Sequence, residues 1–254
     1  MLNVIILAVV QGITEFLPVS SSGHLVILQE LLGVNAPGAG LEIALHLGTL
    51  LSIIFFYRRD LAELIKSLFK THSDNFKLSW KTVCFVFIGS IPAGIIGILF
   101  DEKIEKIFDN PKLASGMLLI TAVILLSTLL SKRENKKLGF ANSLAIGISQ
   151  AIAILPGISR SGSTIACARI FGIGASDAAR FSFYLAIVSI SGAALLKLIK
   201  SPGDFSFAYI CGAIIAAIVG YFALKILIGL LKKGKLWVFA PYCALVGIVG
   251  LIFL

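Results

Sequence analysis

The sequence predicts an all-α protein that crosses a membrane several times, and two observations lead to this fold class. First, 58% of the 254 residues are hydrophobic and only 14% are charged, with a mean hydropathy of +1.00. Soluble domains carry about a quarter charged residues, so lipid is expected to be the main solvent here. Second, six stretches are apolar and long enough to span a bilayer as helices, at approximately 41–57, 79–100, 112–131, 178–199, 206–231 and 236–254.

Two further apolar regions, 3–33 and 140–172, are interrupted near the middle by Leu-Pro and a cluster of Ser and Gly. Each half is about 12 to 15 residues long, which is too short to cross a bilayer. Proline removes a backbone donor and disfavours helix in the residue before it, so the helix should break there. We expect each region to form a re-entrant helical hairpin that enters the membrane and returns to the same side.

The two interruptions resemble each other, because QGITEFLPVSSSGH (11–24) is echoed by QAIAILPGISRSGST (150–164). Gln11 and Ser20 match Gln150 and Ser159 at an offset of 139 residues. The sequence therefore predicts one membrane domain, 1–254, made of two repeats at about 1–137 and 138–254. Each repeat would be a re-entrant hairpin plus three spans. Three is odd, so the repeats should have inverted topology, with the two interruptions meeting near the midplane.

The basic residues indicate how the chain is oriented. One side of the predicted membrane carries most of the Lys and Arg, and this side should be cytoplasmic. Both termini would then lie outside the cell membrane, and the basic segment 58–81 would be a solvated or headgroup-facing loop. The net charge of +9 is explained in this way and requires no nucleic acid. The richer side holds Arg58, Arg59, Lys66, Lys70, Lys77, Lys81, Lys132, Arg133, Lys136, Lys137, Arg180, Lys232, Lys233 and Lys235, and the poorer side Lys103, Lys106, Lys112, Lys197 and Lys200.

The serine clusters of the two interruptions favour an anion site. Ser is a preferred N-cap, so a new helix should begin within 20–22 and another within 159–161. Their free N–H groups and positive dipole ends would face each other, which suits a phosphate. Arg160 adds a fork of donors with a permanent charge. Because an unpaired arginine at this depth would be costly, it needs either Glu15 or an anionic ligand.

The first interruption also holds groups that suit attack on phosphorus. Ser21 offers a hydroxyl, and His24 can exchange a proton near neutral pH. Glu15 can orient the imidazole or accept a proton itself. Spacing alone leaves open whether Ser21 or His24 attacks. Other polar residues are interpreted as helix caps or phosphate donors, and His46 as pocket lining or packing. The caps and donors are Ser20, Ser22, Ser159, Ser161 and Thr164, and Gln11 and Gly23 are further predicted phosphate-binding residues.

The two interruptions resemble the signature motifs of the undecaprenyl pyrophosphate phosphatases of the bacitracin-resistance type, and the resemblance extends over essentially the whole chain. The first motif is represented by Gln11, Glu15, Pro18, Ser20, Ser21, Gly23 and His24, and the second by Pro156, Gly157, Ser159, Arg160, Ser161 and Thr164.

This resemblance implies removal of the terminal phosphate from a membrane polyprenyl diphosphate, the lipid carrier used in cell-wall synthesis. It also implies a divalent cation (Mg²⁺ or Ca²⁺), an active site facing outside, and a possible homodimer. By resemblance Ser21 is the nucleophile, Arg160 the pyrophosphate clamp and His24 the proton shuttle. Position 11 is Gln where many members carry Glu. A neutral amide binds metal less well, so Glu15 is the better candidate for the base or a metal ligand.

A membrane transporter or lipid flippase for an anionic, phosphorylated lipid is the alternative. Inverted repeats with helices broken at the midplane are typical of transporters. A flippase, however, has no need for a carboxylate, a hydroxyl and an imidazole on one hairpin. The sequence therefore favours the phosphatase.

Overall fold

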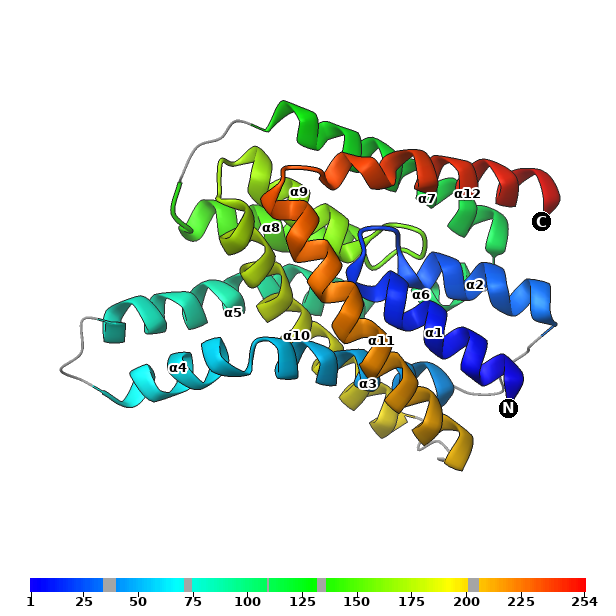
Figure 1. Ribbon diagram of the computed structural model, residues 1–254, viewed down its shortest axis with the longest axis horizontal. Coiled ribbons are helices and arrows are strands. Elements are labelled where there is room, and N and C mark those ends of the chain that lie inside the picture. Colours follow the sequence, from blue (N-terminus) through cyan, green and yellow to red (C-terminus); the bar gives the residue numbers. More distant parts are fainter. Residues whose placement is uncertain (34–39, 71–74, 109, 132–135, 201–205) are drawn as a thin grey trace.

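The computed structural model describes residues 1–33, 40–70, 75–108, 110–131, 136–200 and 206–254, and within these ranges the chain is helical with no strand. Figure 1 shows the helices as a bundle of long and short rods. In chain order they are α1 (Leu2–Phe16), α2 (Ser21–Leu32), α3 (Gly40–Phe56), α4 (Arg58–Phe69), α5 (Asn75–Leu99), α6 (Asp101–Phe108), α7 (Pro111–Ser127), η1 (Thr128–Leu130), α8 (Phe140–Ile152), α9 (Arg160–Ile170), α10 (Ala175–Lys200), α11 (Phe207–Lys232), η2 (Leu236–Phe239) and α12 (Ala240–Phe253).

The long helices match the predicted spans. In the described ranges, five helices are long and apolar enough to cross a membrane: Phe76–Leu99, Pro111–Leu130, Ala175–Lys200, Phe207–Lys232 and Leu236–Phe253. A sixth span is formed if α3 and α4, which meet at a bend of 71°, count as one broken helix. The prediction of an all-α, multi-pass membrane protein is therefore confirmed.

The segment 58–81 differs from the expected loop, because it contains α4 and the beginning of α5. Leu61 and Leu64 of α4 are partly buried against the main core. They are three residues apart and separated by exposed or charged side chains, which is the spacing of an amphipathic helix. The hydroxyls of Ser67 and Ser79 lie 2.5 Å apart and join α4 to α5. The many charged residues of this segment outweigh the narrow apolar stripe, so the sequence alone indicated a loop.

The two broken regions form two pairs of short helices. In each pair, α1 with α2 and α8 with α9, the helices pack against each other. They contain 15, 12, 13 and 11 residues respectively. Each is shorter than the roughly 20 residues that cross a bilayer.

Ion pairs between helix ends define two opposite ends of the molecule. At one end Lys197 Nζ lies 3.6 Å from Glu42, and Lys200 Nζ lies 2.5 Å from Asp101. At the other end Arg180 Nε lies 3.5 Å from Asp60 of α4. Both chain termini lie at the right of Figure 1, whereas α4 and the start of α5 lie at the left.

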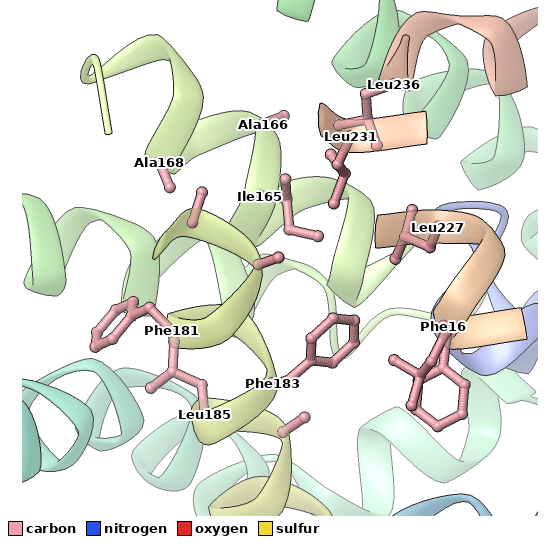
Figure 2. Close-up of a cluster of buried hydrophobic side chains, with 14 of the residues drawn as sticks. Phe16, Ile165, Ala166, Ala168, Phe181, Phe183, Leu185, Leu227, Leu231 and Leu236 are labelled. Carbon is pink, nitrogen blue, oxygen red and sulfur yellow. The ribbon is translucent and has the colours of Figure 1, made fainter. Parts of the chain in front are cut away.

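A buried hydrophobic cluster fixes the inner end of α1 (Figure 2). The Phe16 ring meets the Phe183 ring of α10 edge to face, with centroids 5.9 Å apart. Ile165 of α9 and Leu227 of α11 belong to the same cluster, and all four side chains are fully buried. Close packing around Phe16 limits the conformational freedom of the preceding residue, Glu15.

Candidate active site

The two chain interruptions contact each other directly, as the repeat predicted. The hydroxyl of Ser161 donates to the carbonyl of Leu17 at 3.4 Å. A Cβ at Gly23 would lie 2.9 Å from Gly157 Cα, and one at Gly162 would lie 3.2 Å from Pro18 Cβ. Any side chain at Gly23 would therefore push the two loops apart, and this steric limit explains why position 23 is a glycine.

Serine caps the helix that leaves each interruption. Ser20 Oγ accepts from the N–H of Gly23 at 3.3 Å, and Ser159 Oγ accepts from the N–H of Gly162 at 3.1 Å. Both N-cap predictions are confirmed, so the N-termini of α2 and α9 both lie at the junction of the loops. Ser20 has a φ of 69°, a left-handed value that side chains rarely adopt. Strain of this kind clusters at functional sites.

The carboxylate of Glu15 is the hub of the junction. Its Oε1 accepts from Arg160 Nη2 at 2.6 Å, and its Oε2 accepts from Ser21 Oγ at 2.5 Å. The amide of Gln11 donates to the same Oε2 at 3.0 Å, and His46 Nε2 lies 3.7 Å from it. Glu15 is only 7% exposed. Of the two partners that the sequence allowed for Arg160, Glu15 or an anionic ligand, the structure shows Glu15.

Two polar atoms at this hub are left without a protein partner among the described residues. Arg160 Nη1 and Gln11 Oε1 are both buried and form no hydrogen bond. Buried polar groups are nearly always satisfied, so such atoms are the natural contacts of a ligand or of water. Arg160 thus holds Glu15 with one nitrogen and keeps another nitrogen for an anion.

His24 lies apart from this hub. Its Nδ1 contacts the Ser20 carbonyl at 2.8 Å, and its Nε2 contacts the Tyr242 hydroxyl at 2.8 Å. The rings of His24 and Tyr242 are stacked at an interplanar angle of 4°. The sequence allowed Glu15 to orient the imidazole of His24, but in the structure both ring nitrogens have other partners. The imidazole thus contacts the backbone carbonyl of Ser20, the N-cap residue with the left-handed φ.

Sequence reasoning did not single out Tyr242, and it interpreted His46 as pocket lining or packing without giving it a partner. In the structure His46 lies beside Glu15, and its Nδ1 contacts the carbonyl of Glu42 at 2.8 Å. Both residues lie on helices outside the two interruptions, α3 and α12. No local pattern marks either one, because only the packing of these helices brings them to the site.

The other predicted phosphate donors divide into two groups. Ser22 and Ser161 each lie 3.3 Å from the hydroxyl of the capping serine of their own loop. Thr164 is fully buried, and its hydroxyl bonds the Arg160 carbonyl at 2.8 Å and Ser182 Oγ at 2.7 Å. It therefore links α9 to α10 and does not face the hub.

Taken together, the fold and the junction define the class: a multi-pass α-helical membrane protein with a buried, charged site between two broken helices. The chain belongs to the family of the bacitracin resistance protein BacA, whose family model matches residues 4–249. This agrees with the resemblance inferred from the two motifs.

Several curated relatives cover nearly the whole chain, and each is named undecaprenyl-diphosphatase. The protein from Halothermothrix orenii is 43% identical, over 98% of this chain and 96% of its own length. The protein from Desulfatibacillum aliphaticivorans is 41% identical, over 99% and 98%. The protein from Korarchaeum cryptofilum is 38% identical, over 96% of this chain and 95% of its own length.

Proposed function

We propose that this chain hydrolyses undecaprenyl diphosphate to undecaprenyl phosphate and inorganic phosphate, which returns the lipid carrier to cell-wall synthesis. The observation that carries the proposal is the contact of Ser21 Oγ with Glu15 Oε2 at 2.5 Å, beside Arg160. A hydroxyl, a base and an anion-binding group converge there, as nucleophilic attack on a phosphate requires. Membership of the BacA family and the names of the relatives support the same activity.

In the proposed reaction Ser21 Oγ attacks the terminal phosphorus and its proton passes to Glu15. The bond from this phosphorus to the bridging oxygen breaks, and undecaprenyl phosphate leaves with the proton that Glu15 returns to it. Water then attacks the phosphoserine, with the regenerated carboxylate of Glu15 as the base, and the bond from Ser21 Oγ to phosphorus breaks, which releases phosphate and restores the Ser21 hydroxyl with the proton from Glu15. The geometry favours Ser21 over His24 as the attacking group, because Ser21 already donates to the carboxylate. Both ring nitrogens of His24 are occupied.

The anion would be held by Arg160 and by the two helix N-termini. Arg160 Nη1 is buried and without a protein partner in the described ranges. The N-termini of α2 and α9 add N–H groups and the positive ends of two helix dipoles. Charge developing on the phosphoryl oxygens during transfer would be stabilised by these groups.

A divalent cation, Mg²⁺ or Ca²⁺, remains part of the proposal on the basis of family resemblance. Among the described residues there is no group of three or more His, Cys, Asp or Glu that could hold a metal alone. Mg²⁺ is commonly bound by one or two carboxylates together with substrate phosphates and water. Glu15 and the unpaired Oε1 of Gln11 would supply the protein ligands of such a site, and the diphosphate would supply the others. The cation would neutralise phosphate charge there.

We further propose one domain, 1–254, built of two inverted repeats whose re-entrant hairpins are α1–α2 and α8–α9. The packing supports this, because equivalent helices form equivalent pairs: α1 packs on α11 as α8 packs on α5, and α3 packs on α11 as α10 packs on α5. Glycine allows the close approach in both halves, at Gly48 against Ala213 and at Gly147 against Gly89.

The charge distribution supports both termini and the active site facing outside the cell membrane. Arg58, Arg59 and Arg180 gather at the end of the molecule that holds Asp60. Lys132 and Arg133, also counted on this side, lie outside the described residues. A homodimer is proposed from family resemblance alone.

Phosphate release from undecaprenyl diphosphate by the purified protein in detergent tests the activity. We expect turnover that is lost with a chelator, returns with added Mg²⁺ or Ca²⁺, and falls to background in a Ser21→Ala, Arg160→Ala double variant. Release no faster than that of the double variant would refute the proposed function. The flippase alternative is not favoured, since the relatives are named as phosphatases.

A further inference from the structure

A second cationic feature lies on the outer surface of the bundle, on α3, α11 and the start of α4. Lys225 Nζ lies 4.6 Å from the centroid of the Tyr221 ring and 5.9 Å from that of Phe222. Arg58 Cζ lies 4.4 Å from the centroid of the Phe55 ring. The rings of Phe55 and Tyr221 meet edge to face at 5.6 Å. These five residues form one continuous group, the Arg58–Lys225 cluster.

Lys225 is unusual because it lies within a predicted membrane span. It is the only charged residue between 207 and 231, in a helix with a hydropathy of 2.5. Phe55 and Phe222 are 56% and 58% exposed on this surface, as expected for side chains that face lipid. An ionisable residue in such a helix is costly and commonly marks a functional site.

The two cations of the cluster have no acidic partner among the described residues. The guanidinium of Arg58 donates to the carbonyl of Phe55 at 2.9 Å, and Asp60, the nearest acid along α4, pairs with Arg180. Stacking on an aromatic face holds a cation in place, but it leaves the positive charge and the N–H donors available. The cluster therefore presents to lipid two positive charges that the aromatic rings hold in place and that no acidic side chain among the described residues neutralises.

We propose that the Arg58–Lys225 cluster binds the phosphate of an anionic phospholipid, such as phosphatidylglycerol, in the leaflet at the Asp60 end of the molecule. Lysine and arginine extend their stems along apolar surface to reach headgroups, and aromatic rings gather at that level. A lipid is the ligand because the exposed rings offer an apolar surface for acyl chains beside the two cations. This site is separate from the Glu15–Arg160 junction and does not depend on the proposed hydrolysis.

Native mass spectrometry of the purified protein, titrated with phosphatidylglycerol or phosphatidylcholine in detergent, tests this site. We expect the wild-type chain to bind one phosphatidylglycerol more tightly than phosphatidylcholine. In Lys225→Met the affinity for phosphatidylglycerol should fall about fivefold, the effect of one basic residue at an anionic membrane surface. Removing a charge from an apolar helix does not oppose its insertion, so this variant is expected to fold.

Three comparisons make the result specific. Lys225→Arg should keep the preference for phosphatidylglycerol, and so should Lys233→Met, which removes an exposed lysine beyond the end of α11. Glycerol phosphate, which has the headgroup chemistry without acyl chains, should not displace the lipid. Equal binding of both lipids by the wild-type chain, or an unchanged affinity in Lys225→Met, would overturn the proposal. Displacement by glycerol phosphate at equal concentration would exclude a lipid-specific site.

Discussion

The two broken helix pairs share one backbone plan but carry different chemistry. In both, a serine caps the second helix and the next residue is its first: Ser21 in α2 and Arg160 in α9. These two residues lie at the repeat offset of 139, and both contact Glu15. One plan thus presents a hydroxyl from one side and a guanidinium from the other to a single carboxylate.

The carboxylate itself has no counterpart. Where the first pair has Glu15, the second has the apolar residues Ala153 and Ile154. The matching glutamines show the consequence. The amide of Gln11 donates to Glu15, whereas both polar atoms of Gln150 are buried and have no partner in the part of the chain that the structure describes. The difference teaches that the repeat supplies the scaffold, while one acid makes one half the reactive half.

Removing the Glu15 carboxylate, which distinguishes the two halves, should lower turnover more than any other change below. In Glu15→Gln the base for Ser21 is lost, and we expect turnover to fall about 10²–10⁴-fold, the usual contribution of a positioned acid–base group. Phosphate release measures this, with thermal unfolding as the control for folding. Near-normal turnover in a folded Glu15→Gln variant would show that Glu15 is not the base.

Removing the hydroxyl of Tyr242 should have a smaller effect. Tyr242→Phe keeps the ring that stacks on His24 but deletes the contact with Nε2. One hydrogen bond contributes about 0.5–1.5 kcal/mol, so we expect the rate to fall about 2–10-fold with an unchanged KM. Tyr209→Phe, on α11, is the matched control. A loss as large as that of Glu15→Gln would mean that the pair has a direct chemical role.

The smallest effect is expected at Gln150. Replacing a buried polar side chain that has no partner by an apolar one of similar size is neutral or stabilising. Gln150→Leu should therefore keep both activity and melting temperature, whereas Gln11→Leu should lower turnover by up to about tenfold through the lost hydrogen bond. A larger loss of turnover in Gln150→Leu than in Gln11→Leu would contradict the proposed difference between the two halves.

Much of the fold was predictable, because lipid imposes simple rules on sequence. Spans need length and low charge, and proline breaks helices, so the boundaries of α5, α10 and α11 were predicted to within a few residues. Helix α4 was not predicted. Its apolar stripe is narrow and its charges dominate any average over the segment, so only the packing of Leu61 and Leu64 reveals it.

The site was predictable where its parts lie within the repeat. The caps at Ser20 and Ser159 and the pairing of Arg160 with Glu15 follow from local rules and from the cost of an unpaired charge. The contacts of His46 and Tyr242 depend on how α3 and α12 pack, and neither residue has a repeat partner that could mark it. The orientation of His24 away from Glu15 likewise follows from a tertiary contact with Tyr242.

The central claim is that Ser21 is the attacking group. Rapid quenching under alkaline conditions during turnover of undecaprenyl diphosphate labelled in its terminal phosphate, followed by peptide mass spectrometry, tests it directly. The predicted result is a transient phosphoryl group on the peptide that contains Ser21, attached to the serine and absent in Ser21→Ala. A phosphoryl group on His24, or turnover that persists in Ser21→Ala, would contradict it.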